Sequence, residues 1–149
     1  MIDRAGVIAF AAGLMVSGGA VFADTWDLFE SRCLAPLEAG GAPEVDGLER
    51  DPSLDVANSR GYRTGDGVFY TEVTAAGRVW ACSAVKRASD DQVVAVQKMQ
   101  ARVDAGRYTS GMSGINPRLM STDWRTPKLQ VDLALLLGDT VLMAREVRK

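Results

Sequence analysis

The sequence contains no histidine and only two cysteines. Without histidine there is no Ser-His-Asp triad, no Cys-His pair and no zinc site built on imidazole ligands. Neither cysteine belongs to a Cys-x-x-Cys motif, so a redox pair of that type is also missing. We therefore predict no catalytic residue, no metal site and no cofactor, and the residues favour a protein without enzymatic activity.

An excess of positive charge is also missing. The chain has 17 Lys and Arg against 19 Asp and Glu, which gives a net charge of −2. A slightly acidic domain of this kind does not have the overall charge that suits nucleic acid or anionic lipid. We therefore expect no nucleic-acid partner.

Only one long apolar run occurs, and it lies at the N-terminus. Arg4 gives a short positive region, Ala5 to Val16 are apolar, and Ala23 ends a small-x-small cleavage site. The alternative is a membrane anchor, which needs a run of ~20 apolar residues. The run from Ala5 to Val16 is shorter than that. The sequence predicts a secretory signal peptide over 1–23 and a single globular domain over 24–149 without a transmembrane segment. The expected location is periplasmic or secreted.

Two cysteines in an exported chain predict one structural disulfide, Cys33–Cys82. Trp26, Phe29 and Cys33 recur at helical spacing, which places two aromatic rings and the thiol on one face of a helix. Pro36 is expected to end that helix. Cys82 lies in a predicted strand, so the bond should hold the helix against a sheet.

Runs of β-branched, aromatic and apolar residues predict five strands, and a capping box predicts a second helix. The strands are expected at 68–73, 77–85, 118–125, 128–137 and 140–147. The second helix should run from Ser89 to Gly106, with a core-facing stripe of Val93, Val96, Met99 and Val103 and with Lys98 and Arg102 turned away from it.

This order of elements predicts an α+β fold. Short links between strands favour antiparallel pairing, so we expect a mostly antiparallel five-stranded sheet with two main helices packed against it, in the order α-β-β-α-β-β-β. The segment 38–67 is rich in glycine and proline and is expected to be loop, with a short helix near Pro52. The segment 110–117 is expected to be a turn-rich connector.

Two short patterns resemble catalytic motifs without their context. Ser83-Ala84-Val85-Lys86 matches Ser-x-x-Lys, which requires both side chains on one face of a helix. In a strand, positions three apart point to opposite faces. Gly111-Met112-Ser113-Gly114 resembles part of a nucleophile elbow, but the full Gly-x-Ser-x-Gly is missing. We interpret the first pattern as strand residues and the second as a flexible loop.

Acidic residues gather within 38–67. Their spacing does not match an EF-hand, which favours a solvated acidic loop. Two acids facing one cleft, as in glycosidases, depend on a distance in space and stay open. The run Arg60–Gly67 mixes bases, a tyrosine and glycines and is a further candidate for anion binding, although it is not a P-loop. The acids are Glu44, Asp46, Glu49, Asp51 and Asp55.

The spacings Trp26-x-x-Phe29-x-x-x-Cys33-Leu34 and Gly77-x-x-Trp80-x-Cys82 resemble those of small, uncharacterised exported proteins of proteobacteria that have two cysteines. The resemblance covers about the first half of the mature chain. It implies a periplasmic location and adds no activity, cofactor or site residue.

We predict a non-catalytic binding or interaction module for another envelope protein or envelope component. Such a surface should include an exposed apolar or aromatic patch, expected near Tyr62, Phe69 or Trp124. Two alternatives stay open: a carboxylate-based hydrolase acting on envelope glycans, and a small-ligand carrier with a pocket between helix and sheet. The run Leu133–Leu137 is apolar on both strand faces and favours a filled interior over a carrier.

Overall fold

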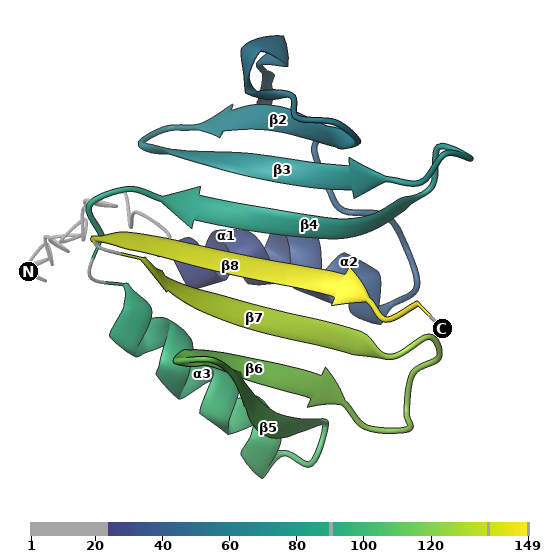
Figure 1. Ribbon diagram of the computed structural model, residues 1–149, viewed down its shortest axis with the longest axis vertical. Helices are drawn as coiled ribbons and strands as arrows, with labels where there is room; N and C mark the ends of the chain where they lie inside the picture. Colours follow the sequence, from purple (N-terminus) through teal and green to yellow (C-terminus); the bar gives the residue numbers. More distant parts are fainter. Residues whose placement is uncertain (1–23, 90, 137, 149) are drawn as a thin grey trace, which may run out of the picture.

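The computed structural model describes residues 24–89, 91–136 and 138–148, and the predicted signal peptide lies outside them. Eight antiparallel strands form one sheet in the order β1-β2-β3-β4-β8-β7-β6-β5 (Figure 1). The sheet therefore consists of two meanders, β1 to β4 and β5 to β8, which meet where β4 pairs with β8. The strands are β1 (Glu49–Arg50), β2 (Ser59–Thr64), β3 (Gly67–Val73), β4 (Val79–Lys86), β5 (Tyr108–Ser113), β6 (Asn116–Ser121), β7 (Leu129–Leu136) and β8 (Asp139–Glu146).

The prediction of an α+β fold with a five-stranded sheet is wrong, because the protein is mostly β and has eight strands in one sheet. The additional strands β1, β2 and β5 come from segments expected to be loop or connector. Their residues have little intrinsic strand preference, so pairing with a neighbour decides their conformation. In β2, for example, Tyr62 lies opposite Phe69 of β3, whose side chain is fully buried.

A short 3₁₀ helix, η2 (Pro52–Leu54), packs on β2 near the edge of the first meander. The sequence predicted a short helix at this position. Leu54 lies directly over Gly61 of β2. A Cβ atom at Gly61 would be 2.3 Å from the Leu54 Cβ, so glycine is required for this contact. The sequence pattern identified the short helix, but it did not show that the following residues form a strand beneath it.

The N-terminal helix is continuous through three segments: α1 (Thr25–Phe29), a π-helical turn η1 (Glu30–Leu34) and α2 (Ala35–Glu38). The prediction that Pro36 ends the helix is wrong. Proline has no N–H to donate to the carbonyl one turn earlier. That carbonyl, on Arg32, instead accepts from the main-chain N–H of Glu44 at 2.7 Å. The loop after the helix thereby supplies the hydrogen bond that Pro36 cannot donate, so the helix continues to Glu38.

The second helix, α3 (Gln92–Asp104), forms as predicted but is rotated relative to the expected stripe. Val93 and Val96 are 65% and 43% exposed, whereas Ala95 and Met99 are buried. Arg102 turns toward the interior, where it forms ion pairs with two carboxylates. The hydrophobic pattern correctly placed Met99 and Val103 against the core, but it misplaced Val93 and Val96 because it could not anticipate a buried arginine.

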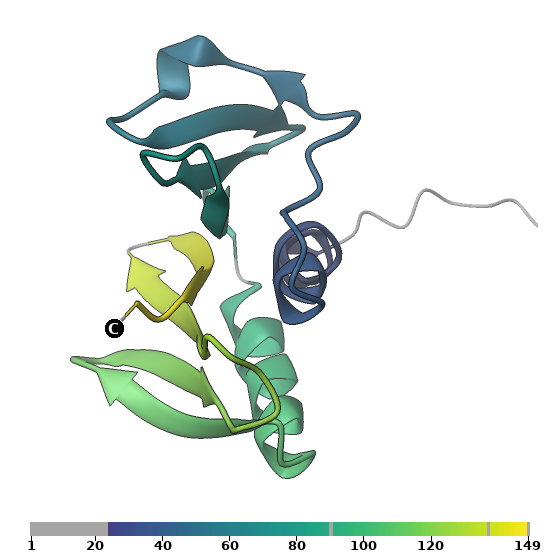
Figure 2. The same cartoon turned by 90° about the vertical axis from the view of Figure 1, so that its right-hand side faces the viewer.

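Both helical units cover the same face of the sheet (Figure 2). The N-terminal helix lies across β4 and β8, and α3 lies across β5, β6 and β7. The predicted disulfide between Cys33 and Cys82 is confirmed, and it joins the helix to β4. Trp26, Phe29 and Cys33 are each at most 1% exposed, as their spacing predicted. No described helix has the length and apolar composition needed to cross a bilayer.

Asp91, just before α3, joins the beginnings of both helices. Its carboxylate accepts from the N–H and the hydroxyl of Thr25 at 3.1 and 2.7 Å. Burial opposes ionisation of Asp91, but the hydrogen bonds from Thr25 and Ser89 and the charge of Lys86 outweigh it and keep the pKa of this carboxyl below its usual value. Because the folded-state pKa is the lower one, its contribution to stability is present above the unfolded pKa of about 3.9.

We expect Asp91→Asn to lower the free energy of unfolding at pH 7 by about 1 kcal/mol, since the amide accepts these hydrogen bonds less strongly than the carboxylate. The difference from the parent should shrink as the pH falls below about 4, where the parent carboxyl gains a proton. Urea unfolding at pH 7 and pH 3 measures both values. An equal difference at the two pH values would show that ionisation of Asp91 is not the cause.

Candidate functional site

The two patterns that resemble catalytic motifs lie on the sheet. Lys86, at the end of β4, is on the helix-covered side and lies 3.5 Å from the carboxylate of Asp91. Ser83, three positions earlier, points to the opposite face, where it is paired with Met143 of β8. Gly111 to Gly114 belong to the end of β5 and its turn into β6, not to a flexible loop.

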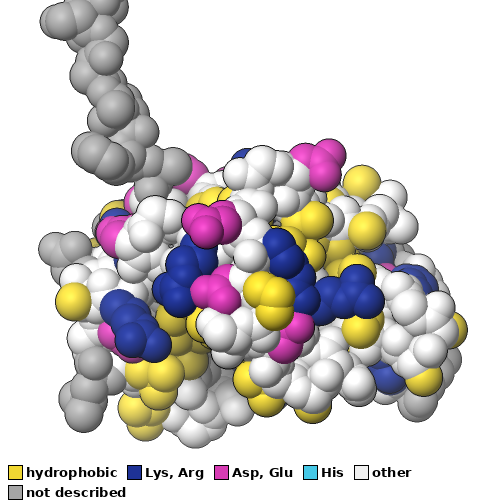
Figure 3. Space-filling model, turned by 90° about the horizontal axis from the view of Figure 1, so that it is seen from above, with side chains coloured by type: hydrophobic (Ala, Val, Ile, Leu, Met, Phe, Trp, Pro, Cys, Tyr) yellow, Lys and Arg dark blue, Asp and Glu magenta, His cyan; other side chains and the backbone are white. Residues whose placement is uncertain are grey.

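Two of the five acids of the segment, Asp51 and Asp55, are ion-paired at the β1–β2 edge of the sheet, where acidic and basic side chains lie side by side (Figure 3). Asp55 forms a two-point ion pair with Arg50, and Asp51 contacts Arg63 at 2.7 Å. Hydrogen bonds from Ser53 to Asp51 and from Arg50 to Asp55 lower the pKa of each carboxyl. Within the described residues no group of three metal-ligating side chains occurs. The segment is thus a surface charge network.

The aromatic residues expected to mark a partner surface do not form one. Phe69 is fully buried, and Tyr62 packs beside it with ring centroids 6.5 Å apart. Trp124 is 38% exposed, but Arg107 covers its ring at 4.1 Å. The expected patch near these residues is therefore not present.

Exposed apolar side chains gather instead at one end of the molecule, which we call the apolar end: Val93, Val96, Met112, Ile115 and Leu136. Each is between 43% and 74% exposed. Two contacts bring the elements that carry these residues to the same end of the molecule. The Gln92 side chain donates to the carbonyl of Leu136, and the Asn116 side chain accepts from the N–H of Leu135. Figure 1 shows the start of α3 and the β5–β6 and β7–β8 hairpins on this same side.

The edge strand β5 leads into the apolar end and is paired on one side only. Its partner β6 lies opposite in a register that pairs Tyr108 with Ser121 and Met112 with Pro117. The bond from the N–H of Thr122 to the carbonyl of Arg107 identifies the hydrogen-bonded positions, which alternate along the strand. The main-chain groups of Tyr108, Ser110 and Met112 therefore point outward, away from β6.

No described residue forms a hydrogen bond with the outward groups of Ser110 or Met112, and residues 109–112 are exposed. The strand also has no charged residue and no proline, which are the features that commonly protect an edge from pairing. At the opposite edge, β1 has only two residues, and both are charged. The β5 edge is thus the long, neutral and unpaired edge of this sheet.

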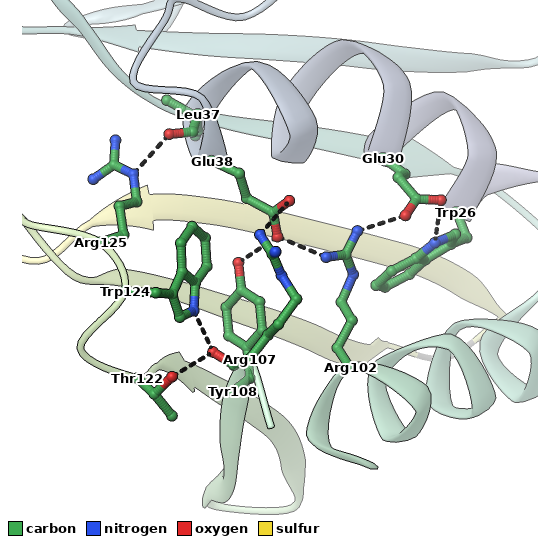
Figure 4. A network of polar contacts seen from close by, with 10 residues as sticks. All are labelled: Trp26, Glu30, Leu37, Glu38, Arg102, Arg107, Tyr108, Thr122, Trp124 and Arg125. Carbon is green, nitrogen blue, oxygen red and sulfur yellow. Dashed lines mark hydrogen bonds and ion pairs between the residues drawn. The ribbon is translucent and has the colours of Figure 1, made fainter. Parts of the chain in front are cut away.

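A buried ionic network fixes the start of β5 to both helices (Figure 4). The hydroxyl of Tyr108 donates to Glu38 at 2.7 Å, and Arg102 bridges Glu38 and Glu30 at 2.6 and 2.5 Å. The Glu30 carboxylate also accepts from the indole N–H of Trp26. Burial and the neighbouring Glu38 carboxylate raise the pKa of Tyr108 far above its usual value, so it remains a hydrogen-bond donor.

The main chain at the beginning of β5 is fixed as well. The carbonyl of Arg107 accepts from the indole N–H of Trp124 at 2.6 Å and from the hydroxyl of Thr122 at 3.2 Å (Figure 4). It also accepts from the N–H of Thr122 at 3.0 Å. Because both the side chain of Tyr108 and the backbone before it are fixed, the outward groups of β5 are held in place before any partner binds.

Sequence reasoning missed this edge because Ser110 to Ser113 lack the β-branched and aromatic residues typical of strands. One local signal was present. Gly114 adopts a positive φ of 63° in the turn between β5 and β6, and such a glycine between two short runs is typical of a hairpin. The outward direction of individual N–H groups, however, depends on register, which the sequence does not specify here.

Two acids with little exposure are engaged by cations in the structure. Glu38 is held by Arg102, and Glu146 by Arg78 and Arg125. Fully buried side chains such as Leu133 and Leu142 fill the core beneath the helices, as the apolar strands predicted. A pocket of about 390 Å³ nevertheless lies between the start of α1 and the sheet, where Leu28, Val85 and Lys86 line it. The geometry thus supports a surface for binding more strongly than an acid–base pair. Comparison of the chain with protein-family models, with curated proteins and with solved structures finds no match in any of the three.

Proposed function

We propose that the chain is a non-catalytic, periplasmic or secreted binding module, and that it binds another envelope protein by adding an extended segment of that protein to β5. The observation that carries the proposal is the unpaired, neutral edge of β5 beside the apolar end. Strand addition is a recurring mode of peptide recognition, in which main-chain hydrogen bonds give affinity and side-chain contacts give specificity.

The edge offers both kinds of contact. Tyr108, Ser110 and Met112 each present one main-chain donor and one acceptor, and a hydrogen bond contributes a net ~0.5–1.5 kcal/mol. The side chains of Met112 and Ile115 are 62% and 74% exposed, so they are accessible to apolar side chains of an added strand. The best-fitting partner segment is therefore extended, apolar at alternate positions and free of proline where it must donate.

The variant Met112→Pro tests the main-chain contribution. It removes one outward N–H but leaves the β5–β6 ladder intact, because Met112 and Pro117 form a non-hydrogen-bonded pair. We expect Met112→Pro and Ser110→Lys each to weaken binding of a partner purified by capture from periplasmic extract by about tenfold. Calorimetry measures the affinity, and hydrogen exchange should slow at the amides of Ser110 and Met112 in the complex.

Two matched variants separate the contributions. Met112→Ala retains the N–H and removes the apolar side chain. Ala76→Lys introduces the same charge as Ser110→Lys at an exposed turn away from β5, and it should bind the partner as the parent does. Parent-like affinity of Ser110→Lys, or unchanged exchange at the two amides in the complex, would refute strand addition.

A further inference from the structure

A groove lies at the end of the sheet opposite to the apolar end. Here the β3–β4 turn, the end of β8 and the 122–128 turn meet (right side of Figure 1). The groove has a volume of about 750 Å³, and its lining includes Arg78, Pro127, Lys128, Glu146 and Arg148. Two smaller cavities of about 270 and 340 Å³ adjoin it and share Glu146. A volume of this size accommodates a small organic ligand.

Cationic groups dominate the mouth of the groove. The side chains of Arg78 and Lys128 are 60% and 48% exposed, whereas the side chain of Glu146 is only 4% exposed. Arg148, which is also exposed, adds a third positive charge. A ligand that enters the groove therefore meets guanidinium and ammonium groups, while the Glu146 carboxylate lies beneath them. One exposed carboxylate, that of Asp123, lies 3.0 Å from the Lys128 ammonium, so the cations still outnumber the acids. The net charge of the whole chain is slightly negative, so it does not reveal this local excess of positive charge.

Glu146 is already neutralised from the interior side. Arg125, which is 7% exposed, donates to its carboxylate at 2.9 Å and to the carbonyl of Leu37 at 2.8 Å. Figure 4 shows Arg125 reaching toward Leu37. Since Arg125 balances the charge of Glu146, the second cation on that carboxylate, Arg78, adds net positive charge to the groove.

We propose that this groove binds an organic anion with an apolar body and a single carboxylate or phosphate head. Arg78 and Lys128 would donate charge-assisted hydrogen bonds to the head. Pro127 and Val147 provide an apolar wall. In the adjoining smaller cavity the guanidinium of Arg148 covers the ring of Trp80, 4.1 Å from the ring centroid. The site is separate from the β5 edge, which lies at the far side of the sheet from β4, so it is a second binding activity and does not depend on strand addition.

Titration calorimetry of the purified protein with octanoate, octyl phosphate, 1-octanol and inorganic phosphate tests the proposal. We expect the two octyl anions to bind at least about tenfold more tightly than octanol and inorganic phosphate, because only they offer both the body and the charge. Their affinity should fall as salt is added. The ratio between octanoate and octyl phosphate identifies the preferred head group. Octanol binding as tightly as octanoate, or no binding of either anion, overturns the proposal.

Two variants locate the site. Lys128→Gln and Arg78→Gln should each weaken octanoate binding about tenfold. Lys128 pairs with Asp123, whose side chain is 96% exposed, so loss of its charge should leave the fold intact, which circular dichroism verifies. Lys98→Gln, on the exposed side of α3, is the matched control and should bind octanoate as the parent does. Parent-like affinity in both groove variants would place the anion elsewhere and overturn the proposal.

Discussion

Replacement of Cys33 and Cys82 by alanine is expected to lower the free energy of unfolding by about 4 kcal/mol, the largest effect we predict for any pair of side chains. The bond closes a loop of 49 positions, and its loss returns that conformational freedom to the unfolded chain. Both thiols are almost completely buried, so the small cavities left by alanine add to the loss. Urea unfolding of the double variant and of the parent measures the difference.

Reduction of the parent with dithiothreitol provides the control, because it removes the bond without changing a residue. The reduced parent should unfold at a urea concentration close to that of the double variant. If the double variant instead unfolds at the same urea concentration as the oxidised parent, the disulfide contributes little and the helix is held on β4 by packing alone.

Arg102→Met is expected to lower the free energy of unfolding by about 3 kcal/mol, because Glu30 loses its cation and Glu38 keeps only Arg107, which lies 3.5 Å away and is 46% exposed. The side chain of Glu38 is 13% exposed and remains largely buried, whereas Glu30 is 39% exposed and regains water more easily. The variant should also loosen β5, since Glu38 positions the hydroxyl of Tyr108. Urea unfolding gives the stability, and hydrogen exchange at residues 109 and 111 reports on the strand.

Arg118→Met is the matched control. Arg118 forms an equally short ion pair with Asp132 at 2.5 Å, but its side chain is 30% exposed on the uncovered face of the sheet. A pair with this access to water contributes about 1 kcal/mol or less. Equal losses in the two arginine variants would contradict the argument that burial of the Arg102 network determines its contribution.

The contrast between these two arginines shows what the sequence could predict about the fold. The stripe of Val93, Val96, Met99 and Val103 identified α3 correctly as a helix, since apolar spacing reports the period of an element. The choice of its buried face was right for Met99 and Val103 but wrong for Val93, Val96 and Arg102, because hydropathy assigns arginine to the surface. Only the carboxylates of Glu30 and Glu38, from a helix far away in the sequence, make the buried position of Arg102 favourable.

Strands were predictable where their own side chains form the core. Phe69, Leu133 and Leu142 lie in β3, β7 and β8, and each is fully buried. By contrast, β2 and β5 exist because a neighbour pairs with them, and local composition does not record that pairing. The candidate interaction surface lies on β5. It could not be predicted from the sequence because the strand itself could not be predicted.

The two-meander arrangement also predicts an order of folding. Within each meander, neighbouring strands are close in sequence, so their pairing closes short loops. The ladder between β4 and β8 is the exception, because it joins Ala81 to Arg145. Pairings of such large sequence separation are slow to form. Both cysteines precede the second meander, so the covalent link between helix and β4 can be made while β8 is still unpaired. The N-terminal half is then already cross-linked when β8 pairs with β4 and completes the sheet.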